Sequence, residues 1–277
     1  MKEDPATDRD DELSNPYERH IACPRSNGLS FPPDPRQLFM LFFISFSTGV
    51  LFGVADKIPL TSLGLIFLQA WMGLLFSIVF IAGFSLSASN PVDPSVLRVW
   101  KFGVQGPREW EDAIERGAKY CVVCKAHVEE ESLHCKYCDK CIPRLDHHCF
   151  YVNNCIGRKN YTLYVFGLVS LFAFSASHFV VASIALVYAF QNDVQALLGF
   201  NTYVWKGLVV ATVLLSFVFT VFTGDLIRLH VLLYLNGMTT LEYSKYLMER
   251  TGSKTMSVGQ LLCPKKNVKK IVEPESG

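Results

Sequence analysis

The sequence has almost no net charge and lacks several signals that would point to other classes of protein. Its 277 residues contain 26 Lys and Arg against 25 Asp and Glu, so the formal charge of +1 gives no indication of a nucleic-acid partner. No glycine-rich phosphate loop of the Walker type is present, so nothing indicates an ATP-driven reaction. The amino-terminal stretch also lacks the basic segment and apolar core of a cleavable signal peptide, so we expect the first apolar segment to stay in the protein.

Full charges are likewise missing from four long apolar blocks, at residues 38–55, 63–86, 163–190 and 207–224, where only His178 can take up a proton. A helix needs about 20 mostly apolar residues to cross a hydrocarbon core of roughly 30 Å. We therefore predict an all-α, polytopic membrane protein with four transmembrane helices.

Lys and Arg are distributed unevenly around these blocks. Five precede the first block, eleven lie within 86–161 and eight follow from position 228, whereas 56–62 holds one and 191–204 none. Cytosolic segments of membrane proteins carry the excess of Lys and Arg. We therefore expect a cytosolic tail at 1–37, helices 1 and 2 within 38–86, a cytosolic loop at 87–162, helices 3 and 4 within 163–235, and a second cytosolic tail at 236–277.

Seven of the nine cysteines lie within 121–155, the core of that loop. Disulfides are one interpretation, but the reducing cytosol keeps thiols free. Zinc binding fits better, because a Cys-x2-Cys pair presents two thiolates to one ion that prefers four tetrahedral Cys or His ligands. Two ions would need eight ligands. The segment offers seven cysteines and three plausible histidine ligands, His134, His147 and His148, so one of each is left without a structural role.

The run Asp146-His147-His148-Cys149 brings a carboxylate, two imidazoles and a thiol within four residues. A cysteine acts as a nucleophile in its thiolate form, and a histidine oriented by a carboxylate is the usual means of activating it. Alternatively, Cys149 is a redundant zinc ligand and Asp146 supports a zinc-bound histidine. The residues alone favour the nucleophile and leave both interpretations open.

With its cysteine spacing, this run resembles the Cys-rich domain of the DHHC-type protein S-acyltransferases, or palmitoyltransferases. The similarity extends to Gly157, Asn160 and Tyr164. Farther along the chain, the residues at 239–242 are similar to the family's TTxE motif, and Thr239 with Glu242 also fits a helix capping box. Residues 90–95 resemble the family's Asp-Pro-Gly element, with Ser95 in place of glycine.

The resemblance implies a site and a reaction. Two structural zinc ions would be held by two sets of ligands, Cys121, Cys124, His134 and Cys141, and Cys135, Cys138, His148 and Cys155. His147 would be the base, Asp146 its orienting partner and Cys149 the acyl carrier. The implied reaction is ping-pong transfer of a long-chain acyl group from acyl-CoA, such as palmitoyl-CoA, to cytosolic cysteines of membrane-associated proteins. The implied location is the membrane of the endoplasmic reticulum or Golgi.

Two departures from the family pattern concern the donor. Phe150-Tyr151 replaces the usual Pro-Trp, and Val-Glu-Glu-Glu at 128–131 replaces a segment with cations, which should weaken the attraction of the anionic CoA phosphates. The remaining cations that we expect near those phosphates are Lys125, Lys136, Lys140, Arg144, Arg158 and Lys159.

Two other functions are compatible with parts of the pattern. A membrane-anchored zinc scaffold without catalysis is the main alternative. A RING-like ubiquitin ligase is disfavoured, because the cluster ends in isolated Cys149 and Cys155 instead of a Cys-x2-Cys pair.

Overall fold

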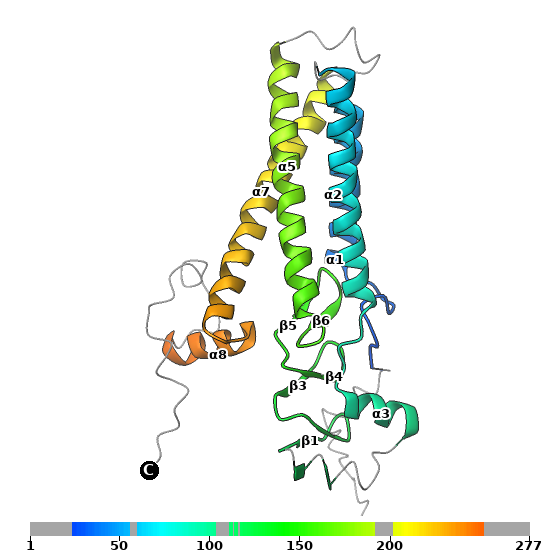
Figure 1. Ribbon diagram of the computed structural model, residues 1–277, viewed down its shortest axis with the longest axis vertical. Coiled ribbons are helices and arrows are strands. Elements are labelled where there is room, and N and C mark those ends of the chain that lie inside the picture. The colour runs from blue at the N-terminus through cyan, green and yellow to red at the C-terminus, as the bar shows by residue number, and fades with distance from the viewer. Residues whose placement is uncertain are drawn as a thin grey trace, which may run out of the picture.

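The computed structural model describes residues 24–55, 60–103, 111–112, 114–115, 117–191 and 202–251. Within these residues, four long helices run side by side above a small region of β-hairpins (Figure 1). The helices are α1 (Pro35–Ala55), α2 (Ser62–Ala88), α5 (Tyr161–Gln191) and α7 (Thr202–Leu235). Each is long and apolar enough to cross a membrane, so the chain is a multi-pass membrane protein.

The helices are apolar on all sides, as expected of helices that contact both one another and lipid. One buried cluster takes residues from all four helices, including Phe43, Val79, Phe174 and Phe219. The rings of Phe43 and Phe219 are stacked with their centroids 3.9 Å apart. Many large apolar side chains outside such clusters are exposed, which suits contact with acyl chains.

Helix α7 is longer at both ends than the uncharged block that predicted it. It includes Lys206, Asp225 and Arg228, because long charged side chains can extend toward water from the end of a membrane helix. The Arg228 Nε lies 3.1 Å from Asp225 Oδ1. The C-terminal half of α7 leans away from the other helices, and α8 (Thr240–Thr251) crosses its end (Figure 1).

The prediction of an all-α protein is wrong for the segment between α2 and α5. Three antiparallel hairpins follow one another there: β1 (Lys119–Cys121) with β2 (Ala126–Val128), β3 (Ser132–Cys135) with β4 (Lys140–Pro143), and β5 (His147–Cys149) with β6 (Asn154–Ile156). Their tight turns place Lys125, Asp139 and Asn153 in the left-handed backbone region. These turns bring potential metal ligands together, which apolar periodicity does not reveal.

Helix α3 (Pro94–Phe102) connects α2 to the hairpins, and Asp93 fixes its start. The Asp93 carboxylate accepts hydrogen bonds from Ser95 N at the helix terminus and from Glu129 N and Ser132 Oγ in the hairpin region. The element that resembles Asp-Pro-Gly is therefore an attachment point, since one buried carboxylate satisfies donors from two parts of the fold.

Residues 24–34, here called the N-terminal strap, pack against the hairpins and the end of α2. Arg25 N donates to Cys138 O over 3.0 Å, and Gly28 N donates to Ser87 O over 2.7 Å. A Cβ atom added to Gly28 would overlap the Val152 carbonyl oxygen, so only glycine fits this close approach. The strap thereby fixes the start of α1 relative to the β5–β6 hairpin.

Candidate active site and metal sites

Two groups of four ligands come together in the hairpins. One is Cys121, Cys124, His134 and Cys141, and the other is Cys135, Cys138, His148 and Cys155; within each group all ligand atoms lie within 4.8 Å of one another. These are the two sets that the family resemblance implied. Each contains three thiols and one imidazole, which is a closed structural zinc set.

The distances within the groups fit a tetrahedral ion. His134 Nδ1 lies 3.4 Å from Cys124 Sγ and 3.8 Å from Cys121 Sγ, and Cys124 Sγ lies 3.7 Å from Cys141 Sγ. Zinc bonds of about 2.3 Å to sulfur and 2.0–2.1 Å to nitrogen would separate ligand atoms by about 3.6 to 3.8 Å. The Asp139 carboxylate lies 3.3 Å from His134 Nε2 and orients that ring from its far side.

Strand alternation explains how one hairpin serves both groups. Neighbouring residues of a strand point to opposite faces. His134 and Cys135 are neighbours in β3, so the first faces one ligand group and the second faces the other. The β3–β4 hairpin therefore joins the two sites into one rigid unit.

The same alternation separates Cys149 from the metal ligands. In β5, His148 pairs with Cys155 of β6, and both belong to the second ligand group. His147 and Cys149 lie on the opposite face, where Cys149 packs with Leu86, Ile156 and Tyr164. Cys149 is therefore outside both groups, although its neighbour is a ligand.

The end of α2 is bonded directly to this hairpin. Asn154 Nδ2 donates to Leu86 O over 2.9 Å and to Ser89 O over 2.7 Å. Asn160 Nδ2 donates to Ser89 Oγ over 3.0 Å and to Cys155 O over 3.0 Å. Asn154 thus satisfies carbonyl groups at the helix C-terminus, and the two side chains together place Cys149 at the end of the helix bundle.

His147 is held in position by Asp146. Its Nδ1 lies 2.7 Å from Asp146 Oδ2. Burial by itself lowers the pKa of His147, but the Asp146 carboxylate and Cys149 outweigh burial and raise the pKa to about 9. For Asp146, burial opposes the charged form, while the bonds from His147 and Thr240 lower its pKa overall. The arrangement can hold a proton on His147 beside a thiol.

A segment far along the chain completes the support of Asp146. Thr240 N donates to Asp146 Oδ1 over 2.9 Å, and Thr240 Oγ1 donates to Asp146 Oδ2 over 2.8 Å. Thr239 and Glu242 form the capping box that their spacing predicted, with reciprocal bonds of 2.7 and 3.2 Å. The TTxE motif therefore caps α8 and presents the helix N-terminus to the Asp146 carboxylate.

Two rings of the helices lie near His147, and of these only Tyr164 was named from the sequence. The His147 ring lies 5.1 Å from the Tyr164 ring and 6.3 Å from the His230 ring, measured between centroids. The Tyr161 hydroxyl lies 3.0 Å from His230 Nδ1. His230 belongs to α7, and its closeness to His147 is visible only in the folded chain.

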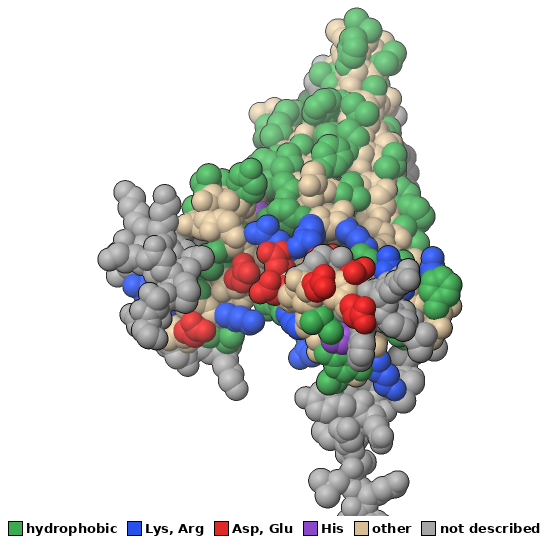
Figure 2. All heavy atoms as spheres, turned by 60° about the horizontal axis from the view of Figure 1, so that its bottom comes forward, with side chains coloured by type: hydrophobic (Ala, Val, Ile, Leu, Met, Phe, Trp, Pro, Cys, Tyr) green, Lys and Arg blue, Asp and Glu red, His purple; other side chains and the backbone are tan. Residues whose placement is uncertain are grey.

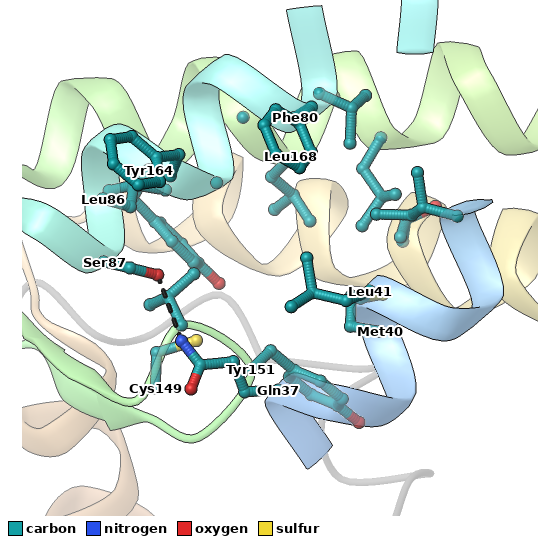
Figure 3. A pocket seen from close by; sticks show the side chains of 18 of the residues that line it. Gln37, Met40, Leu41, Phe80, Leu86, Ser87, Cys149, Tyr151, Tyr164 and Leu168 are labelled. Atoms are coloured by element: carbon teal, nitrogen blue, oxygen red, sulfur yellow. Dashed lines mark hydrogen bonds between the residues drawn. The ribbon is translucent and has the colours of Figure 1, made fainter. Parts of the chain in front are cut away.

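An apolar cavity of about 260 Å³ opens from Cys149 between the four long helices. Figure 3 shows the Cys149 sulfur at one end, with Leu168 and Phe80 farther into the bundle. The lining side chains come from α1, α2, α5 and α7, from the loop after Cys149 and from the N-terminal strap, which contributes Leu29. The shape and polarity suit a hydrocarbon chain attached to this thiol.

The loop after Cys149 begins with Phe150 and Tyr151, the first of the two departures from the family pattern. The Arg36 guanidinium lies over the Phe150 ring at 3.5 Å from the centroid, and Phe150 also packs edge-on against Tyr137. Tyr151 lines the cavity and packs edge-on against Phe222. Phe150 thus attaches the loop to the start of α1, while Tyr151 forms part of the cavity wall.

The cations expected near CoA phosphates have different surroundings. Lys140 is fully buried, and its ammonium donates to Ser26 O and Asn90 Oδ1 over 2.8 and 3.2 Å, so the expectation that it meets a phosphate is wrong. Lys125, Lys136, Arg144, Arg158 and Lys159 are exposed. Of these, Arg144 donates to Gly237 O over 3.0 Å and Lys159 to Val92 O over 2.6 Å.

Arg158 is engaged by the acidic run itself. Its guanidinium lies 2.6 Å from Glu129 Oε2 and 2.5 Å from Glu131 Oε2, and the bond to Glu131 is the main reason that its pKa is raised. The two glutamates therefore form ion pairs with Arg158, a cation that we expected to contact the phosphates of acyl-CoA.

A comparison with known families agrees with this geometry. Residues 114–247 match the family model of the DHHC palmitoyltransferases, a range that covers both ligand groups, Cys149 and the TTxE segment. No curated protein matches the chain in a sequence search. Residues 114–247 of the chain are thus identified as a DHHC palmitoyltransferase domain.

Proposed function

We propose that this protein transfers a long-chain acyl group from acyl-CoA to cysteines of membrane-associated proteins through an acyl thioester on Cys149. The observation that carries the proposal is the position of Cys149. Its thiol is outside both ligand groups, lies beside the Asp146–His147 pair and opens into an apolar cavity within the membrane helices. A scaffold without chemistry would need none of these three features.

The first half of the reaction acylates the enzyme. His147 takes the proton of Cys149, and Asp146 stabilises the resulting imidazolium through the bond to Nδ1. The Cys149 thiolate attacks the carbonyl carbon of the acyl-CoA thioester, and the bond between that carbon and the CoA sulfur breaks. His147 then returns the proton to the CoA thiolate.

The second half repeats this chemistry with a protein thiol. A substrate cysteine loses its proton to His147, attacks the Cys149 thioester and releases the Cys149 thiolate. Thioester exchange is nearly isoenergetic, so no further energy source is required. Zinc bound at the two ligand groups would hold β5 and β6 rigid and so keep Cys149 in position.

The cavity supplies the reason for placing this chemistry at a membrane. Each methylene group moved out of water contributes about 0.8 kcal/mol, so an apolar cavity can retain a long chain while its thioester remains at Cys149. Lys and Arg side chains gather at the border between the apolar helices and the polar region (Figure 2). This border is where the CoA phosphates and the substrate protein would meet the enzyme, on the cytosolic face of an endomembrane.

Labelling of the purified protein tests the proposal. Incubation with a radiolabelled long-chain acyl-CoA should give one hydroxylamine-sensitive label per chain. The Cys149→Ser variant should take up no label and should still contain two zinc ions per chain, because Cys149 is outside both ligand groups. An unlabelled wild-type protein would favour the scaffold. Loss of one zinc ion in Cys149→Ser would show instead that Cys149 is a ligand.

A further inference from the structure

The cavity beside Cys149 is almost entirely apolar, but two buried polar side chains lie at its reactive end. Gln37 of α1 is 8% exposed and Ser87 of α2 is 5% exposed, and both line the cavity with Cys149. Figure 3 shows the Gln37 amide and the Ser87 hydroxyl at the same end as the Cys149 sulfur, away from Leu168 and Phe80. Buried polar groups in an apolar wall call for an explanation.

The hydrogen bonds that the Gln37 amide now donates are long, and the Ser87 hydroxyl has a proton left to donate. Gln37 Nε2 donates to Gly28 O over 3.3 Å and to Ser87 Oγ over 3.4 Å, both longer than the usual 2.9–3.0 Å. Among the described residues, the Ser87 hydroxyl accepts this bond and donates none. By contrast, the Ser47 hydroxyl on α1 donates to Phe43 O over 2.7 Å within its own helix.

The surrounding structure holds both donors in place. Ser87 follows Leu86, which belongs to the same buried cluster as Cys149, and the Ser87 carbonyl accepts the bond from Gly28 of the N-terminal strap. Gly28 O in turn accepts from the Gln37 amide. The donors are therefore fixed by three segments that do not include the DHHC motif.

We infer that the Gln37 amide and the Ser87 hydroxyl form an oxyanion site for the acyl carbonyl at Cys149. This inference rests on the proposed function. As the Cys149 sulfur bonds to the carbonyl carbon, the π electron pair of the carbonyl moves to its oxygen and gives a tetrahedral oxyanion. A charged oxygen accepts shorter and stronger hydrogen bonds than Gly28 O does, so the donors gain on turning toward it. The carbonyl re-forms as the bond to the CoA sulfur breaks, and the CoA thiolate takes the proton held by His147.

The location gives these donors a large effect. A donor in a dry, apolar site stabilises developing charge far more than a donor in water. His147 acts on the sulfur atoms, whereas Gln37 and Ser87 would act on the carbonyl oxygen. The two pairs thus have separate roles that experiments can distinguish.

Three variants and two reactions with Cys149 test the inference. Gln37→Met keeps the length of the side chain without the donor, Ser87→Ala removes the hydroxyl, and Ser47→Ala is the matched control. The first reaction is self-acylation by palmitoyl-CoA in a single turnover, measured over a range of donor concentrations. The second is alkylation of Cys149 by iodoacetamide, followed by mass spectrometry. Alkylation needs the thiolate but forms no oxyanion.

We expect Gln37→Met to lower the self-acylation rate at saturating donor on the order of 100-fold, and Ser87→Ala to lower it less. Neither variant should change the half-saturating donor concentration or the alkylation rate more than about threefold, and Ser47→Ala should match the wild type. Equal losses of acylation and alkylation would overturn the inference, because Gln37 would then only position Cys149. A changed half-saturating concentration with an unchanged saturated rate, or no effect at all, would also overturn it. Failure of the proposed function would look different, since the wild type would be alkylated at Cys149 but not acylated.

Discussion

Thr240 offers the sharpest test of how the distant TTxE segment contributes to the active site. The Asp146 carboxylate accepts from His147 over 2.7 Å, from Thr240 N over 2.9 Å and from Thr240 Oγ1 over 2.8 Å. Thr240→Val removes only the last of these bonds and preserves the shape of the side chain. A hydrogen bond to a charged group contributes about 1.5–3 kcal/mol.

Only part of that free energy should appear in the rate, because the bond supports Asp146 both before and after His147 becomes charged. If about half is specific to the imidazolium state, the barrier rises by about 1 kcal/mol, and each 1.4 kcal/mol corresponds to a tenfold change in rate. We therefore expect Thr240→Val to slow self-acylation at saturating acyl-CoA about five- to tenfold.

The assay is single-turnover acylation with labelled donor, accompanied by zinc analysis of each variant. Thr240→Ser is the matched control, because it retains the hydroxyl and should stay near the wild-type rate. A Thr240→Val rate within twofold of the wild type, with both zinc ions present, would show that Asp146 and His147 keep their geometry without the Thr240 hydroxyl. Equal losses in Val and Ser variants would point to a general disturbance of the helix terminus.

Three other changes probe separate parts of the molecule. Glu131→Gln releases Arg158 from one of its two carboxylates, so the apparent KM for acyl-CoA should be severalfold below that of the wild type at low salt. At high salt the difference between variant and wild type should disappear, because salt screens exposed charges. The same fall in an Arg158→Ala background would contradict this explanation. Gly28→Ala places a Cβ against the Val152 carbonyl and should lower the free energy of unfolding by roughly 1–3 kcal/mol in denaturant or thermal melts, whereas Gly49→Ala, with open space around it, should not; equal stability of the two variants would refute the close approach. Accessibility labelling of single cysteines should place Lys57 and Asn192 on one side of the membrane and Arg98 and Lys254 on the other, and a luminal position for the segment 121–155 would refute the cytosolic assignment; of these four positions, only Arg98 lies within the described residues.

The four spans and the Cys-rich ligand segment of this protein could be predicted from local sequence patterns. An uncharged block of some twenty residues has few alternatives to a membrane helix, because its backbone must satisfy its own hydrogen bonds in lipid. The ligand count indicated that one cysteine and one histidine were left over, and the family resemblance named them as Cys149 and His147. The capping box of Thr239 and Glu242 also formed as expected, since it depends on residues three positions apart.

The tertiary structure decided which groups meet, because those contacts join segments that the sequence separates. Strand alternation in β5 turns Cys149 away from the ligand face of His148, and folding brings Thr240 to Asp146 across 94 positions. The same packing buries Lys140 under the N-terminal strap and pairs Arg158 with Glu129 and Glu131. Two cations that looked alike in the sequence therefore have different surroundings. Gln37 and Ser87 gave no sequence signal at all. Their relation to Cys149 exists only because α1, α2 and the β5–β6 hairpin pack around one cavity.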